Sequence, residues 1–72
     1  MSTISVNGRP RELPPGGLTL AALVAALSPA ANSAAAGLAA AVNEAVVPRS
    51  RWSATELRAG DRVEVLTAVQ GG

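Results

Sequence analysis

The sequence contains no cysteine, histidine, lysine or tyrosine. Without cysteine there can be no disulfide, no thiol chemistry and no cysteine-ligated metal. Without the other three, the chain lacks the commonest general base, the Schiff-base nucleophile and the phenol. The carboxylates are scattered along the chain with no obvious pairing, at Glu12, Glu44, Glu56, Asp61 and Glu64. We therefore expect that the protein is not an enzyme and that it binds no metal or cofactor itself.

Positive charge and aromatic rings are also sparse. The net charge is +1, all six basic residues are arginines, and Trp52 is the one aromatic residue. Nucleic-acid binding normally needs a basic patch with stacking aromatics, so we expect no nucleic-acid partner. The longest largely apolar run, Leu18 to Leu27, is too short to span a bilayer. Residues 1–3 do not resemble the start of a signal peptide. We expect a cytoplasmic protein without membrane association.

A chain of 72 residues makes one domain. A domain of this size buries only about 60% of the surface of its unfolded chain, so we expect modest stability. We assign residues 1–69 to a folded body and residues 70–72 to a flexible C-terminal tail.

The first elements are predicted from alternation and turn chemistry. Ile4 and Val6 alternate with polar residues, which indicates a short strand. Asn7-Gly8 tolerates the positive φ of a tight type I′ turn, and residues 9–13 form the returning strand. Pro10 favours a position near an edge of the sheet or at a bulge.

The register of this first hairpin is left open by the sequence. A two-residue turn places Arg9 and Arg11 on the same face as Val6 and Ile4. Either that face is open near the turn, or the loop is longer.

A helix is the clearest element that follows. The breakers Pro14 to Gly17 precede Thr19, which stands where a helix N-cap belongs. One apolar stripe then recurs at helical spacing, at Leu20, Leu23, Val24 and Leu27. Ser28-Pro29 ends this helix. We expect the stripe to pack against a sheet.

The middle of the chain predicts a second hairpin. We interpret Ala30 to Gly37 as a loop or irregular helical turn, and Leu38 to Val42 as a strand. Asn43-Glu44 makes the turn, because Asn43 accepts a left-handed conformation. Ala45 to Val47 is the returning strand.

The segment after the second hairpin is polar around one large ring. Trp52 is expected to cap the small core, with its ring N–H bonded to a nearby acceptor. Ser53 or Thr55 is expected to cap a short helical turn ending in Leu57. Ala59 to Asp61 reads as a turn.

The last strand is apolar in both parities, first Val63 and Val65, then Leu66 and Ala68. We expect it to be covered on both faces and therefore central. The predicted fold is an α+β roll: a mixed four- to five-stranded sheet with one main helix across one face. Its first and last strands lie side by side and run parallel.

The candidate site is the tail Gln70-Gly71-Gly72. Two glycines make a thin, flexible segment whose reactive group is the α-carboxylate of Gly72. At ~3.3 Å per residue, Ala68 to Gly72 reaches roughly 15 Å beyond the body. Such a tail suits a narrow channel in a partner enzyme.

Several short stretches, in this order, are similar to one known family. They are Val6-Asn7-Gly8, Leu13, Thr19, Ala41-Val42-Asn43, Val46-Val47-Pro48-Arg49, Trp52, Leu57, Gly60-Asp61-Arg62-Val63-Glu64 and Gly71-Gly72. Together they resemble the bacterial sulfur-carrier proteins of thiamine biosynthesis, the ThiS family. Glu44 departs from the pattern, because a glycine there would make the hairpin turn easier.

The resemblance implies a β-grasp, ubiquitin-like fold and a mechanism. An adenylating, E1-like enzyme would use ATP and Mg²⁺ to convert the Gly72 carboxylate to an acyl adenylate. A persulfide sulfur-donor system would then leave a thiocarboxylate, and thiazole synthase would take its sulfur for the thiazole ring. Gly72 would be the modified residue, while Gly71 and Gln70 would give the tail access to its partners.

Other functions remain open at this point. The related small subunit of molybdopterin synthase is also a Gly-Gly sulfur carrier, although the Val47-to-Trp52 stretch favours the thiamine branch. A ubiquitin-like modifier joined to protein lysines would use the same activation. The remaining alternative is an interaction domain with an inert tail.

Overall fold

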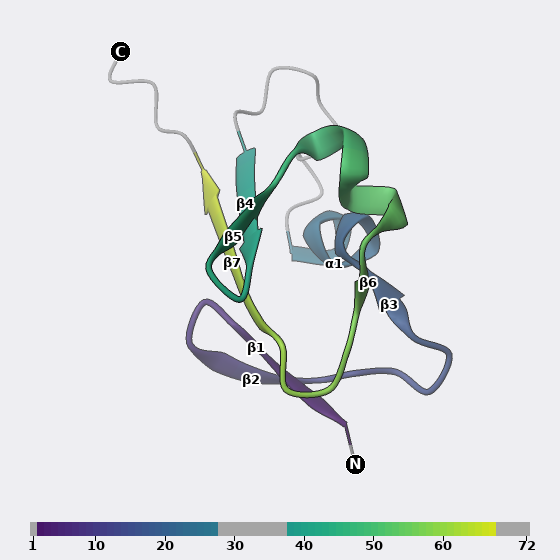
Figure 1. Ribbon diagram of the computed structural model, residues 1–72. Coiled ribbons are helices and arrows are strands. Elements are labelled where there is room, and N and C mark those ends of the chain that lie inside the picture. Colours follow the sequence, from purple (N-terminus) through teal and green to yellow (C-terminus); the bar gives the residue numbers. More distant parts are fainter. Residues whose placement is uncertain (1, 28–37, 68–72) are drawn as a thin grey trace.

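The structure, a computed structural model, describes residues 2–27 and 38–67 (Figure 1). Five strands form one mixed sheet in the order β2-β1-β7-β4-β5, and α1 lies across one face. The predicted α+β roll is therefore confirmed. The elements in chain order are β1 (Thr3–Val6), β2 (Arg9–Glu12), β3 (Leu18–Thr19), α1 (Leu20–Leu27), β4 (Leu38–Val42), β5 (Ala45–Val47), the 3₁₀ helix η2 (Arg49–Ala54), β6 (Glu56–Leu57) and β7 (Arg62–Thr67).

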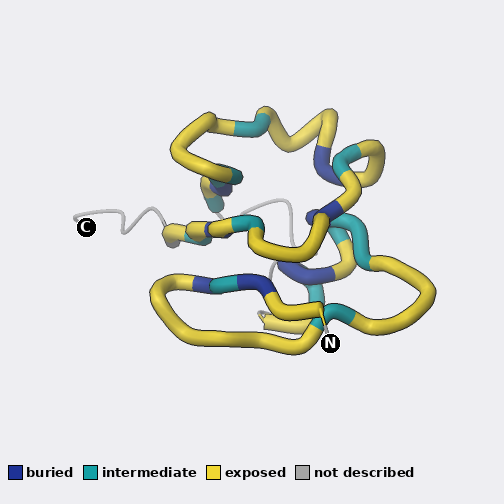
Figure 2. Tube along the Cα trace, turned by 60° about the horizontal axis from the view of Figure 1, so that its bottom comes forward, coloured by how far each residue is buried: buried dark blue, intermediate teal, exposed yellow. Residues whose placement is uncertain are grey.

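The first hairpin turns in two residues. Asn7 has φ 52° and Gly8 has φ 83°, as a type I′ turn requires. Val6 pairs with Arg9, and Ile4 pairs with Arg11. The open question of register is thereby answered: the loop is short, and the face beside the arginines is open. Every residue of β2 is exposed at the edge of the sheet, one of the two positions predicted for Pro10 (Figure 2).

The second hairpin has the predicted bounds in both strands. Asn43 (φ 52°) and Glu44 (φ 72°) form its turn, so a glutamate occupies a left-handed conformation. An L-residue with a Cβ pays about 1–2 kcal/mol there, and Glu44 is accordingly a strained position.

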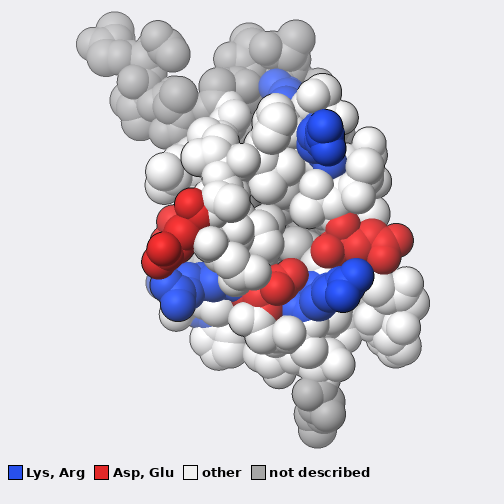
Figure 3. Space-filling view, in the orientation of Figure 1, with Lys and Arg blue, Asp and Glu red and all other residues white. Residues whose placement is uncertain are grey.

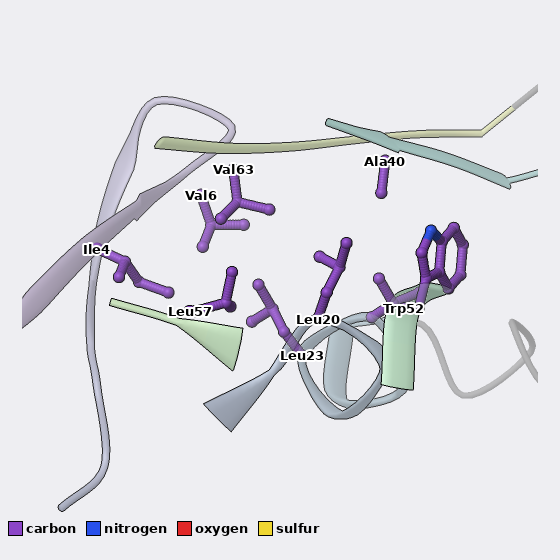
Figure 4. Close-up of a cluster of buried hydrophobic side chains, with 9 residues drawn as sticks. Ile4, Val6, Leu20, Leu23, Ala40, Trp52, Leu57 and Val63 are labelled. Atoms are coloured by element: carbon purple, nitrogen blue, oxygen red, sulfur yellow. The ribbon is translucent and has the colours of Figure 1, made fainter. Parts of the chain in front are cut away.

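The core lies between α1 and one face of the sheet. Thr19 caps the helix as predicted, since its Oγ1 accepts a hydrogen bond from Ala22 N at 3.1 Å. Figure 4 shows Leu20 and Leu23 of α1 pointing towards the sheet. The buried residues are Ile4, Val6, Leu20, Leu23, Val24, Ala40, Trp52, Leu57 and Val63. Leu27, the last member of the predicted stripe, is 38% exposed. The predictions for Ser28-Pro29 and for residues 30–37 lie outside the described residues.

Trp52 closes one side of this core, as predicted. It is 5% exposed, and its Nε1 donates to Val47 O at 2.9 Å. The Arg49 guanidinium lies 5.5 Å from the ring centroid, within cation–π range.

The expected helical turn capped by Ser53 or Thr55 and ending in Leu57 is wrong. The helical turn is η2, which begins directly after Pro48 and ends before Thr55. Glu56 and Leu57 are extended instead and pair with β3. The extended backbone brings Leu57 into the core at 4% exposure. The burial of Leu57 and the pairing with β3 thus override the local preference of this segment for a helical turn.

The last strand is central and runs parallel to β1, as predicted. It pairs antiparallel with β4 on its other edge. The expectation that both of its faces are covered is wrong, because Val63 is fully buried whereas Leu66 is 65% exposed. The strand is central because it is paired on both edges, while α1 covers one face only. The prediction for Ala68 lies outside the described residues.

Candidate functional site

The predicted site residues Gln70, Gly71 and Gly72 lie outside the described residues, as does the proposed boundary between body and tail at residue 69. The structure nevertheless places the strand from which they continue. Residues 68–72 follow the last described residue of β7, Thr67. At ~3.3–3.6 Å per residue, these five residues reach at most about 18 Å. A partner that acts on the Gly72 carboxylate must therefore work close to the end of β7.

The end of β7 is held mainly by β4. The antiparallel ladder runs from Val42 opposite Val63 to Leu38 opposite Thr67. On the other edge, the pairs between β1 and β7 within the described residues are Ser5 with Arg62 and Val6 with Val63. The strand that leads to the tail is therefore paired along its length on one side and only at its start on the other.

Two asparagines from the hairpin turns add side-chain hydrogen bonds to β7. Asn7 Oδ1 accepts from Val65 N at 2.9 Å, and its Nδ2 donates to Val65 O at 3.3 Å. Asn43 Oδ1 accepts from Arg62 N at 2.9 Å, and its Nδ2 donates to Asp61 Oδ1 at 3.1 Å. One asparagine thus holds the start of β7, and the other holds it further along.

Asp61 ties this network to the preceding turn. Its Oδ2 accepts from Arg58 N at 2.8 Å, so both carboxylate oxygens are used. Gly60 in that turn has φ 88°, and its N–H donates to Thr3 O at 2.8 Å. The entry into β7 is therefore fixed by side chain and backbone together.

The sheet face opposite α1 carries an apolar surface beside the end of β7. We call it the open-face patch, and it consists of Ala39, Ala41, Val46 and Leu66. Leu66 lies opposite Ala39 and Val46 opposite Ala41 in the sheet register. Val46 is 77% exposed and Leu66 is 65% exposed. With Glu64 they border a shallow hollow of about 70 Å³.

Charged side chains near the patch are few and exposed. Arg62 Nη1 lies 3.5 Å from Glu44 Oε2, with 62% and 79% of the two side chains exposed. Solvent screens such a pair, so its contribution to stability is at most small. In the view of Figure 3, acidic and basic side chains lie next to one another rather than forming a patch of one sign.

Neither a metal centre nor a membrane span is found in the part of the chain that the structure describes. Residues 2–27 and 38–67 hold no group of three or more potential acidic, histidine or cysteine ligands. No helix in the same ranges has the length and apolar character needed to cross a bilayer.

Sequence reasoning missed two features of this surface. Leu66 and Val46 were assigned to strands without recognising that their face is open. Leu66 has the opposite parity to the buried Val63, and Val46 has the opposite parity to the half-buried Val47. Asn7 was recognised only as a turn residue. The local sequence gives no indication of its bond to Val65, which lies 58 residues further along the chain.

The fold defines the class of protein. A helix packed on a five-stranded mixed sheet, with the first and last strands parallel at its centre, is the β-grasp of ubiquitin-like proteins.

Comparison with known proteins narrows this class. The model of the ThiS family matches residues 4–72. The crystal structure of the thiamine biosynthesis protein (ThiS) from Geobacter metallireducens superposes with a TM-score of 0.73 at 30% sequence identity, covering 97% of this chain and 99% of that one. No curated protein matches the chain. The chain belongs to the ThiS family, whose members are small sulfur carriers of thiamine biosynthesis and not themselves catalysts.

Proposed function

We propose that this sulfur carrier works through a thiocarboxylate on Gly72. The Gly72 carboxylate attacks the α-phosphorus of ATP, bound with Mg²⁺ in an E1-like partner, and pyrophosphate leaves. The acyl adenylate is needed because a free carboxylate has no good leaving group. The observation that carries the proposal is that the family match extends over residues 4–72 and so includes the Gly-Gly end.

The sulfur step follows from the same activated carbon. The terminal sulfur of a persulfide attacks the acyl carbon, and AMP leaves. A second thiol then cleaves the sulfur–sulfur bond, becomes part of a disulfide, and releases the carrier as its thiocarboxylate. Thiazole synthase accepts that sulfur for the thiazole ring.

The composition supports a carrier that leaves chemistry to its partners. With no cysteine, lysine or histidine, the chain offers no internal thiol, amine or imidazole to attack its own acyl adenylate. The persulfide therefore meets no competing side-chain thiol, amine or imidazole on the carrier.

The open-face patch is the surface that we assign to the activating enzyme. The short reach of residues 68–72 requires this enzyme to cover the body around the end of β7. Leu66 is in that part of β7 and offers an apolar side chain that is 65% exposed. Covering it would contribute roughly 1–2 kcal/mol, because burial of a whole leucine contributes about 1.5–3 kcal/mol.

Leu66→Ser tests this surface, with Leu27→Ser as its control. Leu27 is also a partly exposed leucine, but it ends α1 on the other side of the sheet. We expect Leu66→Ser to raise the KM for the carrier in ATP–pyrophosphate exchange about tenfold, which corresponds to about 1.4 kcal/mol. Leu27→Ser should leave this KM unchanged. Equal KM values for Leu66→Ser and wild type would exclude the patch as the docking surface.

The thiocarboxylate itself is tested by the intact mass of the protein isolated from its own host. We expect a population heavier by the replacement of one oxygen with sulfur. The added mass should disappear when Gly72 is deleted. Its absence from the wild-type protein, in cells that are making thiamine, would contradict the proposal.

A further inference from the structure

Asn7 extends the hydrogen bonding of β7 beyond the end of β1. In the described residues, the backbone of β1 pairs with β7 only through Arg62 and Val63. The Asn7 backbone N–H donates to Val63 O at 2.9 Å. The Asn7 side chain then bonds both backbone groups of Val65, accepting from N at 2.9 Å and donating to O at 3.3 Å. The carboxamide thus acts as one additional peptide unit of β1.

The hairpin turn does not itself require this side chain. Asn7 has φ 52°, a conformation that glycine adopts without strain. A glycine at position 7 would make the same turn but would offer Val65 nothing. Asparagine can do both, because its amide carries an acceptor and a donor like those of a peptide group.

We propose that Asn7 is a positioning residue for the chemistry at Gly72. It fixes Val65 on the edge where β1 has ended, and so sets the direction in which β7 leaves the body. This inference rests on the proposed function of Gly72. Without the Asn7 side chain, the described residues hold the end of β7 through its ladder with β4, and the strand can pivot about that ladder.

Loss of the Asn7 side chain is expected to affect turnover by the activating enzyme rather than binding of the carrier. The body docks through its own surface, so the enzyme still binds a carrier that lacks the Asn7 side chain. The carboxylate, however, must reach a near-attack position against the α-phosphorus, and small misplacements reduce such rates strongly. Loss of the side chain should therefore lower kcat and leave KM for the carrier unchanged.

Asn43 provides a matched control within the same chain. It also occupies a type I′ turn with φ 52°, and its side chain also bonds the backbone of β7. Its partner is Arg62, at the start of the strand rather than near its exit. Asn43→Gly therefore removes a comparable side-chain hydrogen bond to β7 without freeing the C-terminal end of that strand.

The experiment compares Asn7→Gly, Asn7→Asp and Asn43→Gly with wild type. ATP–pyrophosphate exchange is measured against carrier concentration, with the activating enzyme that accepts the wild-type chain and at a temperature where melts show each variant to be folded. We expect Asn7→Gly to lower kcat about tenfold with KM within twofold of wild type, and Asn43→Gly to change neither more than about twofold. Asn7→Asp keeps the turn and the acceptor for Val65 N but turns an oxygen towards Val65 O, so its kcat should also fall.

The outcomes separate this inference from the proposed function. A wild-type chain that supports no exchange would overturn the proposed function. Normal exchange by wild type, with unchanged kcat in folded Asn7→Gly or folded Asn7→Asp, would overturn the positioning role alone. Equal losses of kcat in Asn7→Gly and Asn43→Gly would do the same, since they would follow general destabilisation. If Asn7→Gly does not fold, Asn7→Asp decides the matter.

Discussion

Leu23→Ala is expected to remove a large part of the stability of the body. Leu23 is 0% exposed in the middle of α1 and points towards the sheet (Figure 4). Truncating such a side chain leaves a cavity that α1 and the sheet cannot both close, at a cost of about 2–4 kcal/mol. At about 0.05–0.15 kcal/mol per residue, a protein of 72 residues has a stability of only about 4–11 kcal/mol.

Urea unfolding measures this loss directly. With a slope of about 1 kcal/mol per molar urea for a small domain, the midpoint should fall by about 2–4 M. Leu27→Ala is the matched control, because the same substitution in the same helix affects a side chain that is 38% exposed. We expect it to cost about 1 kcal/mol or less. A loss below roughly 0.5 kcal/mol for Leu23→Ala, or equal losses for the two variants, would refute the packing described here.

Three further predictions concern the tail and one turn. Deleting Gly72, or adding one residue after it, should abolish ATP–pyrophosphate exchange without changing the melting temperature; wild-type exchange by either variant would contradict the need for a free glycyl carboxylate at fixed reach. Gly71→Val should likewise leave the melting temperature unchanged, because the described core lies within residues 4–63, but should block thiocarboxylate formation by restricting φ and ψ near the nucleotide. A normal thiocarboxylate yield, by mass, would show that the channel accepts a branched side chain. Glu44→Gly should stabilise the body by up to about 1 kcal/mol, since it relieves a φ of 72° and gives up only an exposed ion pair; a lower urea midpoint would contradict this.

The hairpins and the helix were predictable because their determinants are local. Asn-Gly strongly favours a tight left-handed turn, and Asn43 favours one in the second hairpin, so the predicted bounds of β4 and β5 were correct. Thr19 stands directly before the helical stripe, and its capping bond reaches only to Ala22. The type and position of each of these elements can therefore be predicted from neighbouring residues, although their stability depends on packing in the folded body.

The errors fell where distant contacts decide the structure. The two-residue strands β3 and β6 were missed, because each exists only by pairing with the other through Leu18 and Leu57. Residues 53–57 were expected to be helical for the same reason, since their local sequence carries no trace of β3. The strand β7 was assigned two covered faces because apolar residues occur in both parities. Its sequence could not show that α1 covers one face alone.

Part of the candidate site could be predicted from the sequence, and part depends on contacts between distant residues. Gln70, Gly71 and Gly72 were predicted from the sequence as a thin, flexible end with a reactive carboxylate, and the resemblance to a family added their roles. The match over residues 4–72 supports that resemblance. The open-face patch and the Asn7 bonds depend on sheet order and register, which bring Val46 near Leu66 and Asn7 beside Val65. Neither the patch nor the Asn7 bonds could therefore be predicted from the local sequence.

The central position of β7 lets the body stay folded while a partner enzyme acts on the tail that continues from this strand. Peeling this strand away would break its pairing with β4 and β1 and would also uncover Val63, which is fully buried. The edge strand β2 could detach at far lower cost, because all of its residues are exposed. A tail continuing from an edge strand could therefore unravel the sheet when an enzyme draws it in, whereas a tail continuing from β7 is anchored in the core. The face towards α1 supplies that anchoring, and the opposite face, with Leu66 beside the exit, remains free for partners. Substitutions in the first face should then change stability, and substitutions in the second should change recognition.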